Sequence, residues 1–205
     1  MNDHPIVALV CSAGGLNALM TVLGPLPEGL PAAVVVLQHM PPDRQSELPA
    51  ILKRVTALPV SWAEDGVALE PGCVLAAPPG HHTLVTKDET IALIQSGPAP
   101  PYRPSADLLL TTLALAVRRR AIAVVLSGEG QDAATGATAV HRFGGTVIVS
   151  SPETSERTAM PRATMIRDGI TDHVTPLDDL AGLLVALTTA LAIELGETER
   201  PAAPA

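Results

Sequence analysis

The amino-acid sequence predicts an α/β fold: a doubly wound, mostly parallel sheet with helices on both faces and a small antiparallel hairpin insert. Continuous apolar, β-branched runs at Ile6–Cys11 and Ala33–Gln38 are typical of strands that are covered on both faces. Apolar residues at helical spacing over 14–23 separate these runs, which indicates a right-handed βαβ unit. Short apolar runs between Gly and Pro turns over 59–94 predict the antiparallel insert.

The rest of the chain continues the alternation of helices and strands that is typical of this class. Strands are expected at 121–126 and 146–150, and helices at 46–55, 104–120, 132–143, 161–167 and 177–195. Residues 180–193 carry no charge but fall short of the roughly 20 residues that cross a bilayer, so they are expected to form a buried helix. We therefore expect one domain over 5–195, followed by a flexible tail over 196–205.

The composition excludes several classes of protein. The 205 residues have a formal net charge of −8 and include one Trp, one Tyr and one Phe, so they lack the basic surface and the aromatic platforms of nucleic-acid binders. Cys11 and Cys73 are the two cysteines, and no basic and apolar leader follows Met1. These features predict a cytoplasmic protein with free thiols and no membrane insertion.

Three polar residues follow three of the predicted strands: Ser12 after the first, His39 after the second and Asp132 after the strand at 121–126. Ligands of open α/β sheets bind outside the carboxyl ends of the strands, and neighbouring strands lie about 5 Å apart. A nucleophile, a base and a carboxylate are thus expected at one edge of the sheet. The amide of Ala13, at the start of the following helix, can donate to a developing oxyanion.

Each of these residues also has a purely structural interpretation. Ser12 can cap the helix that follows it or contact a phosphate, and His39 can be an ordinary loop residue. Asp132 can be the N-cap of the helix at 132–143, a role that is compatible with catalysis because a cap holds a carboxylate rigidly. The residues alone leave these alternatives open.

Other candidate sites are weaker. Gly14-Gly15 does not complete a dinucleotide-binding fingerprint, and no Walker loop occurs. His81 and His82 would point to opposite faces of a strand, so the pair is a poor metal site. Cys11 ends a buried strand and is expected to be packed in the core rather than to act as a nucleophile. The residues therefore predict no dinucleotide cofactor and no metal site at His81 and His82.

Motifs that occur in order along the chain carry a resemblance to a known family. They are Ala8-Leu-Val-Cys-Ser-Ala-Gly-Gly-Leu-Asn-Ala-Leu, Gln38-His-Met-Pro, Arg103-Pro-Ser-Ala-Asp, Ser127-Gly-Glu-Gly-Gln-Asp-Ala-Ala-Thr-Gly and Met160-Pro-x-Ala. Together they closely resemble the catalytic domain of the bacterial chemotaxis protein-glutamate methylesterase family, CheB, over about residues 6–184. The resemblance implies that Ser12 is the nucleophile, His39 the general base and Asp132 the orienting acid, with no metal or cofactor.

The resemblance also implies an activity and partners. The family hydrolyses γ-methyl esters of glutamate on the cytoplasmic helices of chemoreceptors, and many members also deamidate glutamine there. Methylated chemoreceptor helices are therefore the expected partners. The family's N-terminal receiver domain is not expected in a chain that starts just before its first strand, so a separate response regulator or signalling protein is a further expected partner. The alternatives are a non-catalytic module that binds receptor or signalling partners, and an esterase for another methyl ester.

Three positions depart from the pattern of the family. Glu129 stands where a methionine amide of the family helps to form the oxyanion hole, Ala133 where glycine is usual, and Ala159 where glycine precedes Met-Pro. The main-chain amide of Glu129 is retained, so Ala13 and Glu129 are the expected oxyanion donors. A carboxylate about 8 Å from the oxyanion would oppose its charge by about 2 kcal/mol at an effective dielectric constant near 20, so Glu129 is expected to slow the reaction.

Overall fold

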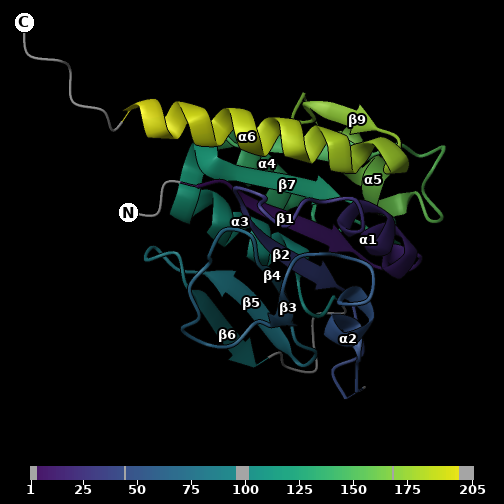
Figure 1. Ribbon diagram of the computed structural model, residues 1–205. Coiled ribbons are helices and arrows are strands. Elements are labelled where there is room, and N and C mark those ends of the chain that lie inside the picture. The colour runs from purple at the N-terminus through teal and green to yellow at the C-terminus, as the bar shows by residue number, and fades with distance from the viewer. Residues whose placement is uncertain (1–3, 44, 96–101, 168, 199–205) are drawn as a thin grey trace, which may run out of the picture.

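The computed structural model describes residues 4–43, 45–95, 102–167 and 169–198. At its centre lies a seven-stranded sheet in the order β3-β4-β2-β1-β7-β8-β9, in which every pair is parallel (Figure 1). The strands are β1 (Ile6–Cys11), β2 (Ala33–Gln38), β3 (Val60–Trp62), β4 (Val74–Ala76), β7 (Ala121–Val125), β8 (Thr146–Ser150) and β9 (His173–Thr175). The strand order reverses at β1, which lies between β2 and β7, so the carboxyl end of β1 is the expected place for a ligand.

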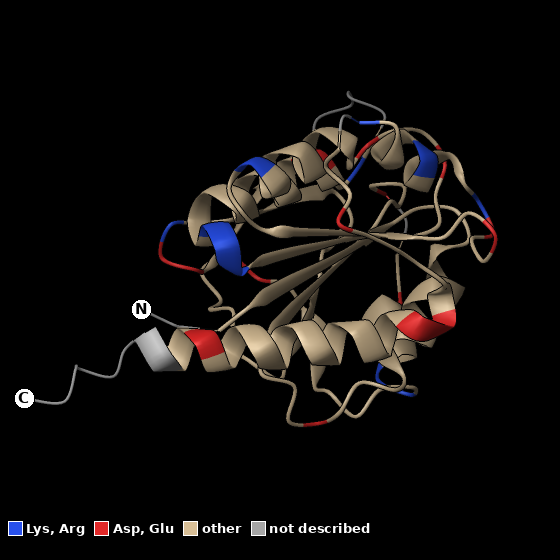
Figure 2. Cartoon of the chain, turned by 90° about the horizontal axis from the view of Figure 1, so that it is seen from above, with Lys and Arg blue, Asp and Glu red and all other residues tan. Residues whose placement is uncertain are grey.

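Helices cover both faces of this sheet, which confirms the predicted doubly wound α/β class. On one face lie α1 (Gly15–Leu23), α2 (Leu48–Leu52) and α6 (Leu180–Thr198), and on the other lie α3 (Ala106–Val117), α4 (Ala134–Arg142) and α5 (Ala159–Met165). Seen from above, the sheet runs between α6 and the helices of the opposite face (Figure 2). Successive residues of β1 point into the two cores in turn, and all six are buried, which explains the uninterrupted apolar run in the sequence.

The antiparallel insert is smaller than the sequence predicted. β5 (His81–Val85) and β6 (Ile91–Gln95) form a hairpin that packs on the same side as α3. β3 and β4, which were expected in the antiparallel patch, instead extend the parallel sheet, and β9 was not predicted. Strands of three residues carry too few side chains for their pattern to show the direction of their partners.

Several helices begin or end at other residues than predicted. α2 covers Leu48–Leu52 rather than 46–55, although the Ser46 hydroxyl accepts a hydrogen bond from the Leu48 amide at 3.2 Å. α3 ends at Val117, after which Arg118–Arg120 form a 3₁₀ turn. α6 continues to Thr198, so the first residues of the predicted tail are helical, and residues 199–205 lie outside the described part.

The prediction that the uncharged C-terminal stretch forms a buried helix is only partly correct. Leu180, Leu184 and Thr188 are buried on the sheet, but Ile193 is 56% exposed. The segment Leu177–Gly196 has the length and the composition of a membrane span, with a mean hydropathy of 1.6. Residues 180–193 of α6 carry no charge, Asp178 and Asp179 directly precede the helix, and the long middle part of α6 is accordingly uncharged in Figure 2. Because one side of α6 packs into the core, the helix is a structural part of the domain.

Candidate active site

The candidate nucleophile lies on a tight turn between β1 and α1. The Ser12 amide donates to the Ser127 carbonyl at 3.0 Å, and the Gly15 amide donates to the Ser12 carbonyl at 2.9 Å. Gly14 has φ +73°, and a β-carbon there would lie 2.7 Å from the Ser127 hydroxyl oxygen. A β-carbon on Gly15 would lie 2.6 Å from Cβ of Cys11. The two glycines are therefore required by the turn that presents Ser12, which is half-buried.

The candidate base follows the neighbouring strand. Cys11 and Gln38 are register partners in the parallel pair of β1 and β2, so Ser12 and His39 come next to each other at the sheet edge. The His39 amide donates to the Cys11 carbonyl at 3.0 Å and fixes this arrangement. The sequence-based expectation that the two residues lie side by side is thus met by the backbone. Ser12 and His39 both lie in the described part of the chain, and their side chains form no hydrogen bond with each other. In enzymes without bound substrate, such a contact often forms only when the substrate binds.

His39 and Asp132 form a buried pair. Nε2 of His39 lies 2.8 Å from Oδ2 of Asp132, and the two side chains are 10% and 3% exposed. An ionised carboxylate can only accept hydrogen bonds, so Nε2 carries the proton and Nδ1 carries the lone pair. Nδ1 is therefore the atom that can take a proton from a nucleophile, whereas the usual triad template uses Nε2.

Asp132 is held by the N-terminus of α3 rather than by the helix that follows it. Its carboxylate accepts hydrogen bonds from the Ala106 amide at 2.6 Å, the Asp107 amide at 3.0 Å and the Ser105 hydroxyl at 3.2 Å. The N-cap residue of α4 is Ala133, which has no side-chain cap, so the interpretation of Asp132 as the cap of α4 is wrong. Burial raises the pKa of Asp132, but the hydrogen bonds from His39 and from the amides of Asp107 and Ala106 outweigh it and hold the pKa below its usual value.

Asp107 performs for α4 the function that Asp132 performs for α3. Its Oδ1 accepts hydrogen bonds from the amides of Ala133, at 3.0 Å, and Gly136, at 2.7 Å. Asp132, which precedes α4, therefore accepts hydrogen bonds from the N-terminus of α3, and Asp107 of α3 accepts hydrogen bonds from the N-terminus of α4. Burial, followed by the nearby charge of Asp132, raises the pKa of Asp107 against the effect of these amides. Ala133, with φ +97°, is held in a conformation that favours glycine, as the family pattern indicates.

Asp107 and His82 also contact the residues around Asp132, and neither was predicted from the sequence to belong to the site. His82 is buried on β5, and its Nδ1 accepts a hydrogen bond from the Ser105 amide at 3.0 Å. Burial lowers the pKa of His82, the charge of Asp132 opposes this effect, and Arg103 lowers the pKa further. The neutral ring therefore links the hairpin to the residue that binds Asp132. Asp107 and Ser105 lie in the motif Arg103-Pro-Ser-Ala-Asp, and a capping serine just before a helix was the signal available in the sequence.

The expected oxyanion donors lie on two loops beside Ser12. The amides of Ala13 and Glu129 make no hydrogen bond to another residue in the described part of the chain. A β-carbon on Gly128, which precedes Glu129, would lie 3.0 Å from Cβ of Ser12, so this loop runs directly past the candidate nucleophile. Two free amides beside a serine are the donors that a tetrahedral oxyanion requires.

The carboxylate of Glu129 is largely exposed to solvent and lies near the guanidinium of Arg157. The Glu129 side chain is 61% exposed, and Oε1 lies 3.8 Å from Nε of Arg157. The guanidinium offsets the negative charge, and water screens both groups. The structure therefore weakens the expectation that Glu129 slows the reaction strongly.

Ser127 and Cys11 have structural roles beside the site. The Ser127 hydroxyl donates to the Ala13 carbonyl and accepts from the Arg157 amide, both at 2.9 Å, so it joins the nucleophile turn to the loop before α5. Cys11 is fully buried, and burial raises the pKa of its thiol. A neutral, inaccessible thiol is a poor nucleophile, as the sequence analysis expected.

A cleft of about 590 Å³ opens beside His39, lined also by Met40, Pro41, Pro42, Asp43 and Arg103. A second cleft, of about 370 Å³, is also lined by His39, Met40 and Pro41 and runs between α1 and α2.

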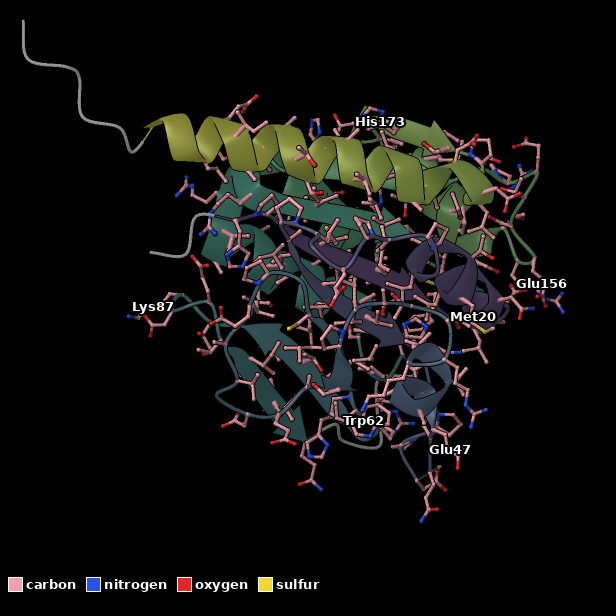
Figure 3. All side chains as sticks on the ribbon, in the orientation of Figure 1. Met20, Glu47, Trp62, Lys87, Glu156 and His173 are labelled. Carbon is pink, nitrogen blue, oxygen red and sulfur yellow. The ribbon has the colours of Figure 1, made fainter. Side chains whose placement is uncertain are left out.

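Figure 3 shows Met20, Glu47 and Glu156 at the end of the molecule that carries the site, and Lys87 at the opposite end. Within the described ranges, no group of three or more His, Cys, Asp or Glu residues could hold a metal ion.

The fold and the site define a doubly wound α/β protein with a serine, a histidine and an aspartate at the carboxyl edge of a parallel sheet. The CheB methylesterase family matches residues 7–184. The chain belongs to this family.

Similar proteins share the name that the family suggests. The protein-glutamate methylesterases/protein-glutamine glutaminases of Moorella thermoacetica and Geobacillus kaustophilus are each 38% identical, with 90% of this chain covered. Only 44% and 54% of those relatives are covered, so the chain spans about half their length. A putative enzyme of this name from Leptospira interrogans is 33% identical, with 91% of this chain and 96% of the relative covered. The crystal structure of the Thermotoga maritima CheB methylesterase catalytic domain superposes with a TM-score of 0.85 at 34% identity, and the match covers 90% of this chain and 98% of that one.

Proposed function

We propose that this chain is a serine hydrolase that demethylates glutamate γ-methyl esters and deamidates glutamine on bacterial chemoreceptors. The observation that carries the proposal is the buried 2.8 Å pair of His39 and Asp132, one strand away from Ser12. The amides of Ala13 and Glu129, which have no hydrogen-bond partner among the described residues, would supply the oxyanion donors of an acyl-transfer site beside Ser12.

The proposed mechanism starts with attack of the Ser12 hydroxyl oxygen on the ester carbonyl. Nδ1 of His39 takes the hydroxyl proton as the new C–O bond forms, and Asp132 stabilises the resulting imidazolium through Nε2. The amides of Ala13 and Glu129 donate to the oxyanion of the tetrahedral intermediate. The intermediate collapses, the imidazolium returns its proton to the leaving oxygen, and methanol departs.

The second half of the reaction releases the acyl-enzyme. Nδ1 of His39 takes a proton from water, the hydroxide attacks the acyl carbonyl, and the glutamate carboxylate leaves as Ser12 recovers its proton. A glutamine side chain follows the same route with ammonia as the leaving group. No step requires a metal or a cofactor.

The substrate, the partners and the location are proposed on the basis of membership in the family. Methylated helices of a chemoreceptor cytoplasmic region are the proposed substrate, and the two clefts that meet at His39 are the surfaces available to bind them. A separate response regulator or signalling protein is the proposed regulatory partner. Both the substrate and such a regulator are cytoplasmic, which is the proposed location of this chain.

Release of labelled methanol from a receptor cytoplasmic fragment that carries labelled methyl esters tests the proposal. Wild-type protein should release methanol and Ser12→Ala should not, while Ser12→Ala retains the fold because the side chain lies on a turn. Ser61→Ala, at an exposed position of β3, is the matched control and should behave as wild type. Equal release by Ser12→Ala and wild type would refute the assignment of the nucleophile, and no release by wild type would favour the non-catalytic binding module.

A further inference from the structure

Tyr102 lies against the candidate base. The ring centroids of Tyr102 and His39 are 5.4 Å apart, with 32° between the ring planes. The Met40 amide donates to the Arg103 carbonyl at 2.8 Å, so the backbone beside Tyr102 is attached to the loop that carries His39. The aromatic ring therefore has a fixed place next to the imidazole, on a segment separate from β1, β2 and the Asp132 loop.

The same tyrosine also contacts the loop of the second oxyanion donor. A β-carbon on Gly130 would lie 2.8 Å from Cε1 and 2.9 Å from Cζ of Tyr102, and still closer to its hydroxyl oxygen. Gly130 has φ +82° and directly follows Glu129, whose amide is a candidate oxyanion donor. Tyr102 thus spans from the base to the oxyanion loop, with the hydroxyl on the side of the loop.

The hydroxyl of Tyr102 makes no hydrogen bond to another residue in the part of the chain that the structure describes, and the side chain is half-buried. The phenol packs against both the candidate base and the oxyanion loop, and its O–H group donates to none of the described residues. It is therefore placed to donate a hydrogen bond to a substrate. The ring also limits the access of water to the imidazole on the side that it covers.

We propose that Tyr102 is a further catalytic residue of this site, and that its hydroxyl donates a hydrogen bond to the oxyanion of the tetrahedral intermediate beside the amides of Ala13 and Glu129. This role rests on the proposed hydrolase function. The hydrogen bond transfers no proton, so the proton path from Ser12 through His39 to the leaving group is unchanged. A donor that acts on the oxyanion contributes to kcat rather than to substrate binding.

Two substitutions separate the hydroxyl from the ring. Tyr102→Phe keeps the ring against His39 and removes only the hydroxyl, so kcat for methanol release should fall by about tenfold to a hundredfold with little change in KM. Tyr102→Ala also removes the ring and should lower kcat further. Phe143→Leu, at the end of α4 remote from the site, is the matched control for loss of an aromatic ring and should retain wild-type kcat.

A spectroscopic measurement reports on the hydroxyl directly, because Tyr102 is the only tyrosine in the chain. Protein labelled with ¹³C at tyrosine Cζ should give one resonance, and an alkyl boronic acid that forms a tetrahedral adduct with Ser12 should shift it. The shift should be absent in Ser12→Ala. A purely structural tyrosine would leave the resonance in place when the adduct forms.

The outcomes separate this inference from the proposed function. Suppose that Ser12→Ala abolishes the turnover of the wild-type protein but Tyr102→Phe keeps the wild-type kcat. This result would overturn the role of the hydroxyl and leave the hydrolase function intact. A Cζ resonance that does not respond to the adduct in active protein would overturn it as well. Absence of turnover in wild-type protein would overturn the hydrolase function and the role of Tyr102 with it.

Discussion

Replacement of Asp132 by asparagine should remove activity and also lower stability, because both carboxylate oxygens are fully used as acceptors. Oδ1 receives the Ser105 hydroxyl and the Asp107 amide, and Oδ2 receives His39 Nε2 and the Ala106 amide. An asparagine offers one acceptor oxygen and one NH₂ group. In either orientation, the NH₂ group faces a backbone N–H of α3 that cannot turn away.

The magnitude of each effect follows from this geometry. One buried donor left without an acceptor costs about 1–3 kcal/mol, which corresponds to a decrease in Tm of about 2–12 °C for a domain of this size. An NH₂ group that faces His39 forces the imidazole proton onto Nδ1, and the opposite orientation still removes the charge that stabilises the imidazolium. A loss in kcat of about 10⁴-fold is therefore expected, as in other triads.

The stability difference should also depend on pH. The folded-state pKa of Asp132 lies below its usual value, so the ionised carboxylate stabilises the fold above the unfolded-state pKa, near 3.9, and this contribution is lost as the pH falls through the folded-state pKa. The difference in free energy of unfolding between wild type and Asp132→Asn should therefore be largest near neutral pH and should shrink in acid.

Urea unfolding at several pH values and initial rates of methanol release measure both effects. Asp88→Asn, at a side chain 72% exposed in the hairpin turn, is the control and should change neither quantity. A loss in kcat below about tenfold would refute the role of Asp132 in orienting His39, since it corresponds to less than about 1.4 kcal/mol of transition-state stabilisation. Unchanged stability would refute the argument from the α3 amides.

Three further predictions follow from the same contacts. Asp107→Ala removes the acceptor for two amides at the start of α4 and should lower the free energy of unfolding by about 1–3 kcal/mol. Asp107→Asn should lower it much less, because the carbonyl oxygen of asparagine can replace Oδ1. Equal losses of the two variants in urea unfolding would contradict the capping argument. Glu129→Met should change kcat by less than about fivefold, because an exposed charge paired with an arginine has an effect of at most about 1 kcal/mol. A tenfold gain in the rate of methanol release would instead show that the carboxylate acts on the oxyanion. A thiol reagent should label Cys73 in the native protein, whereas Cys11 should react only after unfolding because it is fully buried. Rapid labelling of both thiols in the native protein would contradict the burial of Cys11.

The sequence by itself determined the parts of this protein that depend on local pattern. Six consecutive apolar residues in β1, rich in β-branched side chains, predicted a strand that is covered on both faces, and the Gly14-Gly15 pair predicted a turn that another part of the backbone can approach closely. The placement of Ser12 and His39 at neighbouring strand ends followed from the βαβ unit, whose handedness and strand spacing are general properties of chains.

The tertiary structure decided which groups each polar residue contacts. Asp132 directly precedes α4 in the sequence, which suggested a local cap, yet its carboxylate binds the N-terminus of α3 while Asp107 caps α4. Side-chain direction in a loop is selected by the buried donors nearby in space, and sequence distance carries no information about them. The same holds for Glu129, whose largely exposed carboxylate lies 3.8 Å from Nε of Arg157, a neighbour that the sequence motif alone could not reveal.

The short strands and the contacts of Tyr102 also required the folded structure. β3 and β4 have three residues each, so their parallel partners were set by the space beside β2 rather than by any pattern of their own. Tyr102 is a single aromatic residue in an irregular segment, and nothing periodic surrounds it. Its position between His39 and Gly130 arises because packing brings three distant segments together at one sheet edge, where the burial of aromatic surface stabilises the arrangement.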